Sequence, residues 1–223
     1  MTAEHPALVV GLDDWRQRIT AAKKTQWPLI DRYLRAVGCQ RPYPALQPNG
    51  KPFLWCGSFA ARCYEVALGL RPDVATLWAS TYKIVRMFGQ YQPDDNIPSP
   101  CIVALPDGGQ QKITRYHAQN GGQRLCLPGR KEIPGLLPGD VLTCGVGAVG
   151  GHVALYVGPS PDGLGVRTLS GNGWGWFPGP DGEPDESKKV SGVVLADVPW
   201  ASVAWAIRPA PADLDESLVL VRR

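Results

Sequence analysis

The sequence lacks several features that would point to common classes of protein. It has no apolar run as long as a transmembrane helix, so no membrane span is expected. It has no block of lysine and arginine, and a formal net charge of +3 is too small to indicate nucleic-acid binding. The N-terminal stretch MTAEHPALVVGLDDWRQR lacks the basic and apolar regions of a signal peptide. We therefore expect synthesis in the cytoplasm and no export by the general secretory route.

The cysteine pattern also excludes a familiar site. None of the six cysteines forms a CxxC pair, and no Cys/His cluster has the spacing of a zinc site. We expect no metal and no other cofactor. An even number of cysteines would permit disulfides, but a cytoplasmic start predicts reduced thiols, which are often small buried hydrophobic residues.

The composition that is present is that of a folded globular chain, with 44% hydrophobic and 19% charged residues among 223. Gly 26 and Pro 22 are scattered and indicate many turns. Apolar residues at helical spacing, with capping and stop signals, predict helices in the first part of the chain. These are one capped by Asp13-Asp14 that carries Trp15 and Ile19, one that starts at Pro28 and stops at Gly38, one over 56–68 that stops at Gly69, and one over 73–88.

Strand patterns follow after residue 90. They cover 101–105 and 112–116 as a hairpin, then 140–144, 152–157, 166–170, 192–196 and 202–207. Helices first and strands later predict an α+β fold with an antiparallel sheet. We expect an N-terminal helical region over 1–50 that packs on a main domain over 51–209, and a tail over 210–223.

Cys56 lies at the predicted start of a helix, in the stretch PFLWCGSFAARCYEVALGL. The free N–H groups and the positive dipole end of a helix N-terminus favour a thiolate and can bind a developing oxyanion. A nucleophilic cysteine also needs a base. The chain has three histidines, of which His5 lies in the N-terminal stretch, His117 follows a strand and His152 opens the strand HVALYV.

His152 is the favoured base, because a rigid strand can aim it and the preceding stretch GVGAVGG lets a substrate approach the backbone. Strand alternation puts His152, Ala154 and Tyr156 on one face of the sheet. Ser170 and Asn172, at the end of the next strand, are candidates to orient the imidazole. Asn172 between two glycines also fits a plain turn residue.

Four motifs occur in order along the chain: LWCGSFAARCYEVALGL, LLPGDVLTC, GGHVALYVG and LSGNG. Together they resemble the CHAP family of cysteine, histidine-dependent amidohydrolases/peptidases, within the NlpC-like, papain-like clan. The resemblance spans about residues 50–209. It implies a papain-like fold with Cys56 as nucleophile, His152 as general base and Asn172 as the polar orienting residue. Many members carry a glutamate where this chain has Ser170, so Ser170 is the alternative third residue.

The resemblance further implies a peptidoglycan amide bond as the substrate, within the stem peptide or between peptide and sugar. Trp55, Trp174 and Gly151 are the candidate substrate-binding residues. A cytoplasmic start and a wall substrate together suggest a phage-type lysis enzyme or an antibacterial effector of a contact-dependent system such as type VI secretion. Such an effector would act in the periplasm or cell wall of a target cell and would imply a cognate immunity protein that blocks its cleft.

Two other classes stay open on the sequence alone. One is an intracellular thiol acyltransferase or deamidase that acts on a protein. The other is a catalytically inactive binding module on the same fold. His117 remains the rival base, and segment 90–135 is longer than expected, as an elaboration that shapes the cleft would be.

Overall fold

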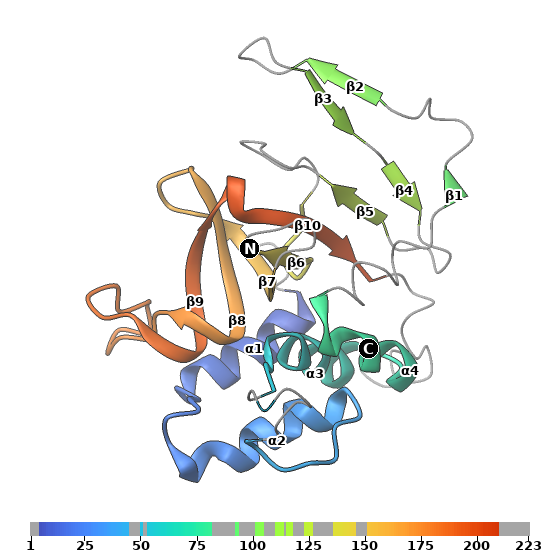
Figure 1. Ribbon diagram of the computed structural model, residues 1–223. Helices are drawn as coiled ribbons and strands as arrows, with labels where there is room; N and C mark the ends of the chain where they lie inside the picture. Colours follow the sequence, from blue (N-terminus) through green and yellow to red (C-terminus); the bar gives the residue numbers. More distant parts are fainter. Residues whose placement is uncertain are drawn as a thin grey trace.

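The computed structural model describes residues 5–44, 50, 53–81, 92–93, 101–104, 110–113, 115–117, 123–126, 136–145 and 151–209. Between residues 92 and 126 it describes the strand backbones alone. The fold is α+β, as the order of the sequence patterns predicts: the helices lie together below one curved antiparallel sheet (Figure 1). Among the described residues, no helix combines the length and apolar character needed to cross a bilayer.

Three helices form the layer under the sheet, namely α1 (Pro6–Arg16), α2 (Trp27–Ala36) and α3 (Cys56–Leu68). Helix α3 begins and ends where the sequence predicts, and Gly69 terminates it in the left-handed conformation at φ 67°. The start of α1 differs from the prediction. Pro6 opens it, and His5 caps it by accepting the Ala7 N–H at 3.3 Å through Nδ1, so Asp13-Asp14 lie inside the helix.

The predicted helix over 73–88 also differs from the structure. The chain forms the short helix α4 (Pro72–Ala75), a 3-10 turn η2 (Thr76–Ala79) and one helical residue at 81; residues 82–88 lie outside the described part. The turn brings the Trp78 carbonyl against Gly57 of α3, so closely that a Cβ at Gly57 would overlap it. Within 72–79, the 3-10 turn that packs on α3 interrupts the regular helix.

The sheet has eight described strands in the order β1-β4-β5-β10-β6-β7-β8-β9, and every neighbouring pair is antiparallel. The strands are β1 (Gln92–Pro93), β4 (Arg115–His117), β5 (Gln123–Cys126), β6 (Val141–Cys144), β7 (His152–Pro159), β8 (Gly165–Gly175), β9 (Val190–Pro199) and β10 (Val203–Arg208). The predicted 101–116 hairpin is present as β2 (Cys101–Ala104) paired with β3 (Gln110–Ile113). The predicted strand order in sequence is therefore confirmed, with β1, β4 and β5 added. The tail over 210–223 lies outside the described residues.

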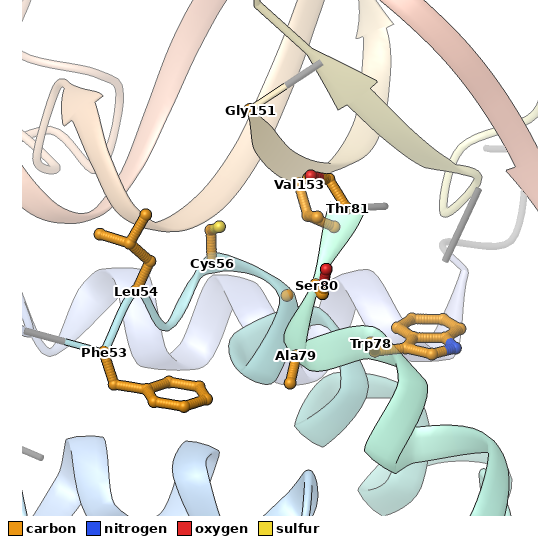
Figure 2. A pocket seen from close by; sticks show the side chains of 10 residues that line it. Phe53, Leu54, Cys56, Trp78, Ala79, Ser80, Thr81, Gly151 and Val153 are labelled. Atoms are coloured by element: carbon orange, nitrogen blue, oxygen red, sulfur yellow. The ribbon is translucent and has the colours of Figure 1, made fainter. Parts of the chain in front are cut away.

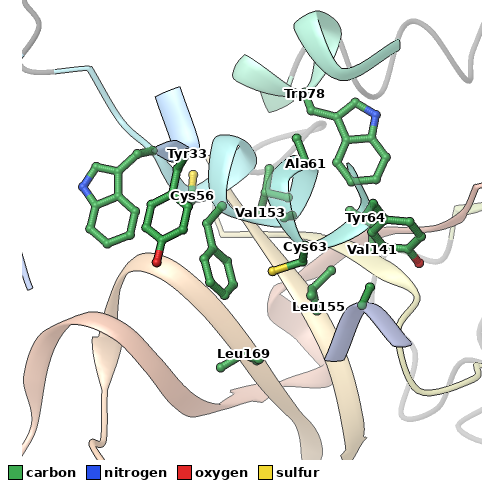
Figure 3. Packing of buried hydrophobic residues seen from close by; sticks show 14 of the residues in the cluster. Tyr33, Cys56, Ala61, Cys63, Tyr64, Trp78, Val141, Val153, Leu155 and Leu169 are labelled. Atoms are coloured by element: carbon green, nitrogen blue, oxygen red, sulfur yellow. The ribbon is translucent and has the colours of Figure 1, made fainter. Parts of the chain in front are cut away.

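The main core fills the space between the helices and one face of the sheet (Figure 3). Val153 and Leu155 of β7 and Leu169 of β8 face α3 there, while Tyr156 joins a second cluster on the opposite face. Cys63 is fully buried in the main core, as its helical position predicts. Alternating residues of β7 thus serve two different layers, and His152 falls on the same alternation as Tyr156.

The Pro-Gly-Asp motif has a structural role at the start of β6. Asp140 is 5% exposed and accepts the Leu137 N–H at 2.8 Å. It also receives two hydrogen bonds of 2.7 Å from Arg208 at the end of β10, one from Nε and one from Nη2. A bidentate arginine–carboxylate pair is the strong form of this interaction, so Asp140 joins β6 to β10.

Replacing Asp140 with alanine is expected to lower the free energy of unfolding by about 2–3 kcal/mol, because it removes the buried partner of a bidentate pair. Arg208 can rehydrate, since its side chain is 45% exposed, which limits the loss. Urea unfolding measures the effect. The control is Asp13→Ala in the exposed pair with Arg16, which should change stability by less than about 0.5 kcal/mol. Equal losses in the two variants would contradict the assignment.

Candidate active site

Trp55 fixes the entry of the chain into α3. It is fully buried and stacks on Tyr33 of α2, with ring centroids 5.5 Å apart and planes inclined by 13°. Tyr33 in turn donates a hydrogen bond of 3.0 Å to Asp14 of α1. The N-terminal helices therefore hold the residue before the candidate nucleophile. Trp55 packs in the core rather than on a substrate-binding surface, in contrast to the sequence-based expectation.

Cys56 is the first residue of α3 and is 6% exposed. Its side chain points up from the helix toward the start of β7 (Figure 2). Burial raises the pKa of the Cys56 thiol, whereas hydrogen bonds from the backbone N–H groups of Val153, Gly57 and Cys56 itself act in the opposite direction. Burial is the larger effect, so the resting group is a neutral thiol surrounded by donors that would stabilise a negative charge.

A cavity of about 210 Å³ opens at Cys56 (Figure 2). Four described segments line it: Phe53 and Leu54 before α3, Cys56 and Gly57 in its first turn, 78–81 at the end of η2 and just after it, and Gly151 with Val153 at β7. The thiol thus faces a space that a small group can enter. The wall formed by 78–81 was not predicted, because it depends on the contact between η2 and Gly57.

His152 opens β7, directly before Val153, which lines the cavity together with Cys56. It is half-buried, and burial lowers its pKa to about 4. No hydrogen bond joins its imidazole to the thiol among the described residues, and His152 does not line the cavity. The structure therefore brings the two groups to neighbouring backbone positions without pairing them. Catalytic hydrogen bonds in ligand-free enzymes are often long and tighten with substrate.

Ser170 and His152 meet at Gly173 of β8. A Cβ at Gly173 would lie 3.5 Å from His152 Nε2 and would overlap Ser170 Oγ. Ser170 is 2% exposed, so its hydroxyl and the imidazole nitrogen face the same buried spot. Asn172 lies between Ser170 and Gly173 in sequence, at a break in the β8–β9 register, and adopts a left-handed conformation with φ 54°. Asn172 thus takes the left-handed backbone that asparagine tolerates, but at an irregularity inside β8 and not in a turn.

The remaining candidates occupy separate places. Trp174 is 72% exposed on β8, outside the cavity lining, whereas Gly151 lines the cavity. His117 ends β4, and its side chain lies outside the described part of the structure. Within the described residues, no group of three His, Cys, Asp or Glu side chains is placed to hold a metal ion together.

Lowered histidine pKa values predict a pH dependence of stability. The unfolded His152 binds a proton below its ordinary pKa of 6.5, but the folded one only below about 4. Stability is therefore complete above pH 6.5 and falls as the pH drops toward 4, by roughly 3 kcal/mol from this group. Urea unfolding at several pH values measures the slope.

In the variant His152→Gln, the free energy of unfolding should decrease less between pH 6.5 and pH 4 than it does in the wild-type protein. Burial also lowers the pKa of His5, so His5 makes a smaller contribution to the loss of stability at low pH. His5→Gln is the matched control. A His152→Gln variant with the wild-type slope would show that the imidazole is not desolvated in the folded protein.

Comparison of the chain with models of known protein families, with curated proteins and with solved structures found no match. The site must therefore be judged on its own geometry and on the sequence motifs.

Proposed function

We propose that the protein is a papain-like cysteine hydrolase that cleaves an amide bond of the cell-wall peptide. One observation carries the proposal: Cys56 begins a helix and faces a cavity that is also lined by Val153, the residue that follows His152. A thiol at a helix start is a placement that nucleophilic cysteine chemistry uses, and His152 begins β7 one residue before the cavity-lining Val153. The α+β architecture is compatible with the fold that the motifs imply.

The resting pair is neutral, and this determines the first step. As substrate binds, the thiol proton moves from Sγ to a nitrogen of His152, and Sγ forms a bond to the carbonyl carbon. The carbonyl oxygen takes the negative charge and accepts the backbone N–H of Cys56. The imidazolium then gives its proton to the leaving nitrogen as the C–N bond breaks. Water, deprotonated by His152, cleaves the thioester and regenerates the thiol.

The third residue is better supplied by Ser170 than by Asn172 in this geometry. His152 Nε2 and Ser170 Oγ both lie close to Gly173. In the proposed mechanism Ser170 binds Nε2, and Nδ1 accepts the thiol proton. A hydroxyl at Nε2 can hold the ring in that tautomer, as the third group of a catalytic triad does. Asn172 remains the alternative that the motif order implies.

The substrate class rests on the resemblance of the four motifs, which implies peptidoglycan. The protein is proposed to act on the wall of a target cell, as an antibacterial effector or as a lysis enzyme. If it is an effector, the producing cell would contain a cognate immunity protein. Digestion of purified peptidoglycan tests the proposal: mass analysis should find fragments with newly released amino groups after incubation with the wild-type protein. A digest identical to the buffer control overturns the wall-hydrolase proposal, and hydrolysis or transfer on a protein substrate would then favour the intracellular alternative.

A further inference from the structure

The described residues in the wall of the cavity beside Cys56 carry no charge. Among the described residues that line it, none is Asp, Glu, Lys, Arg or His, and the Cys56 thiol is the one group that ionises. Phe53, Leu54 and Val153 supply apolar surface, whereas Ser80 and Thr81 supply hydroxyl groups. A charged group that entered would lose its water without gaining a partner of opposite charge, and such burial is costly.

The cavity is also small. Pockets for drug-sized ligands measure roughly 300–1,000 Å³, whereas an apolar cavity of about 150 Å³ already accommodates benzene. A space of about 210 Å³ therefore holds one short side chain with its neighbouring peptide group.

The position of the cavity tells which part of a substrate enters. Once Sγ has attacked, the acyl carbon is bonded to sulfur, and the side chain of the residue that supplied the carbonyl is only two bonds further on. The Cys56 side chain borders the cavity (Figure 2). The side chain of the substrate residue that supplied the carbonyl is therefore the one placed to enter it.

We propose that the cavity is the acyl-side specificity site and that it selects a small, uncharged residue of the alanine type. The inference rests on the proposed thiol hydrolase and names its bond: the scissile carbonyl belongs to an alanyl residue. Bonds whose carbonyl comes from a residue with a free carboxylate or ammonium beside it are poor substrates.

Alkylation of Cys56 tests the inference separately from hydrolysis. N-acetyl chloromethyl ketones of alanine (both enantiomers), glutamate and lysine are incubated with the full chain, and labelling of Cys56 is followed by peptide mass analysis. In each case Sγ displaces chloride and forms a thioether. Rates are divided by those with free cysteine to remove differences in reagent reactivity. The faster alanyl enantiomer should label at least about tenfold faster than the glutamyl and lysyl reagents.

A matched pair of variants links the selectivity to the cavity. Leu54 lines its mouth and is 52% exposed, so Leu54→Arg adds a cation there with little risk to folding. It should lower the alanyl-to-glutamyl rate ratio at least about tenfold. Leu164, 72% exposed and outside the cavity lining, is the control: Leu164→Arg should leave the ratio unchanged.

The outcomes separate the two claims. Equal normalised rates for all reagents, with Cys56 still alkylated and peptidoglycan still cleaved, overturn the specificity inference and leave the hydrolase. A ratio that responds equally to both arginine variants also overturns it. A Cys56 that neither the ketones nor iodoacetamide can label, in a protein without hydrolytic activity, overturns both.

Discussion

Replacing Cys56 with alanine should lower the rate of amide hydrolysis at least about a thousandfold, because it removes the atom that forms the covalent intermediate. The backbone donors around the site remain, so a small residual rate over water is expected. The change removes one buried sulfur at a helix start and leaves the apolar packing of Trp55 and Phe59 in place. The measurement is the initial rate of amine release from purified peptidoglycan.

The control for this prediction is Cys39→Ser. Cys39 is also a free thiol, but it is half-buried and lies beyond α2, away from the cavity. Its replacement should leave the rate within about twofold of wild type, since surface changes away from a site have small effects. A Cys56→Ala protein that keeps the wild-type rate while folded would show that the fold carries another activity or a binding function.

Replacing His152 with alanine should lower the rate by about 10²- to 10⁴-fold, the range that general-base catalysis contributes. His117→Ala should leave it nearly unchanged. With His152 neutral above pH 4, kcat/KM of the wild-type protein should stay level as the pH falls from 7 to 5. An unperturbed histidine would already lose activity near its usual pKa of 6.5.

The comparison that decides the base is made on two folded variants at one pH, with circular dichroism as the check on folding. Loss of activity in His117→Ala with a fully active His152→Ala would refute the assignment of His152. A wild-type rate that declines through pH 6.5 would indicate that the imidazole becomes solvated when the enzyme works.

Local signals in the sequence predicted the parts of the site that local structure determines. Helix α3 was predicted from Cys56 to Leu68 because its spacing and its terminal Gly69 act within the segment itself. The strand at His152 followed from simple alternation. Both features place functional groups at the ends of elements, where periodicity is informative.

Long-range contacts determined the parts that the sequence did not predict. The pattern over 73–88 has helical period, yet the chain turns at η2 because the Trp78 carbonyl packs against Gly57, and this contact forms the cavity wall. His152 was expected to aim at Cys56, but its Nε2 faces Gly173 and Ser170 across the β7–β8 pair. No periodicity in a single segment encodes either contact.

The central claim is that Cys56 carries the acyl group during the reaction. The direct measurement is the mass of the protein quenched in acid during peptidoglycan digestion, followed by identification of the modified peptide. The account predicts an acyl adduct on Cys56, through a thioester that hydroxylamine removes, and no adduct in Cys56→Ala. Amine release by wild type without any adduct on Cys56, or with an adduct on a different residue, would contradict it.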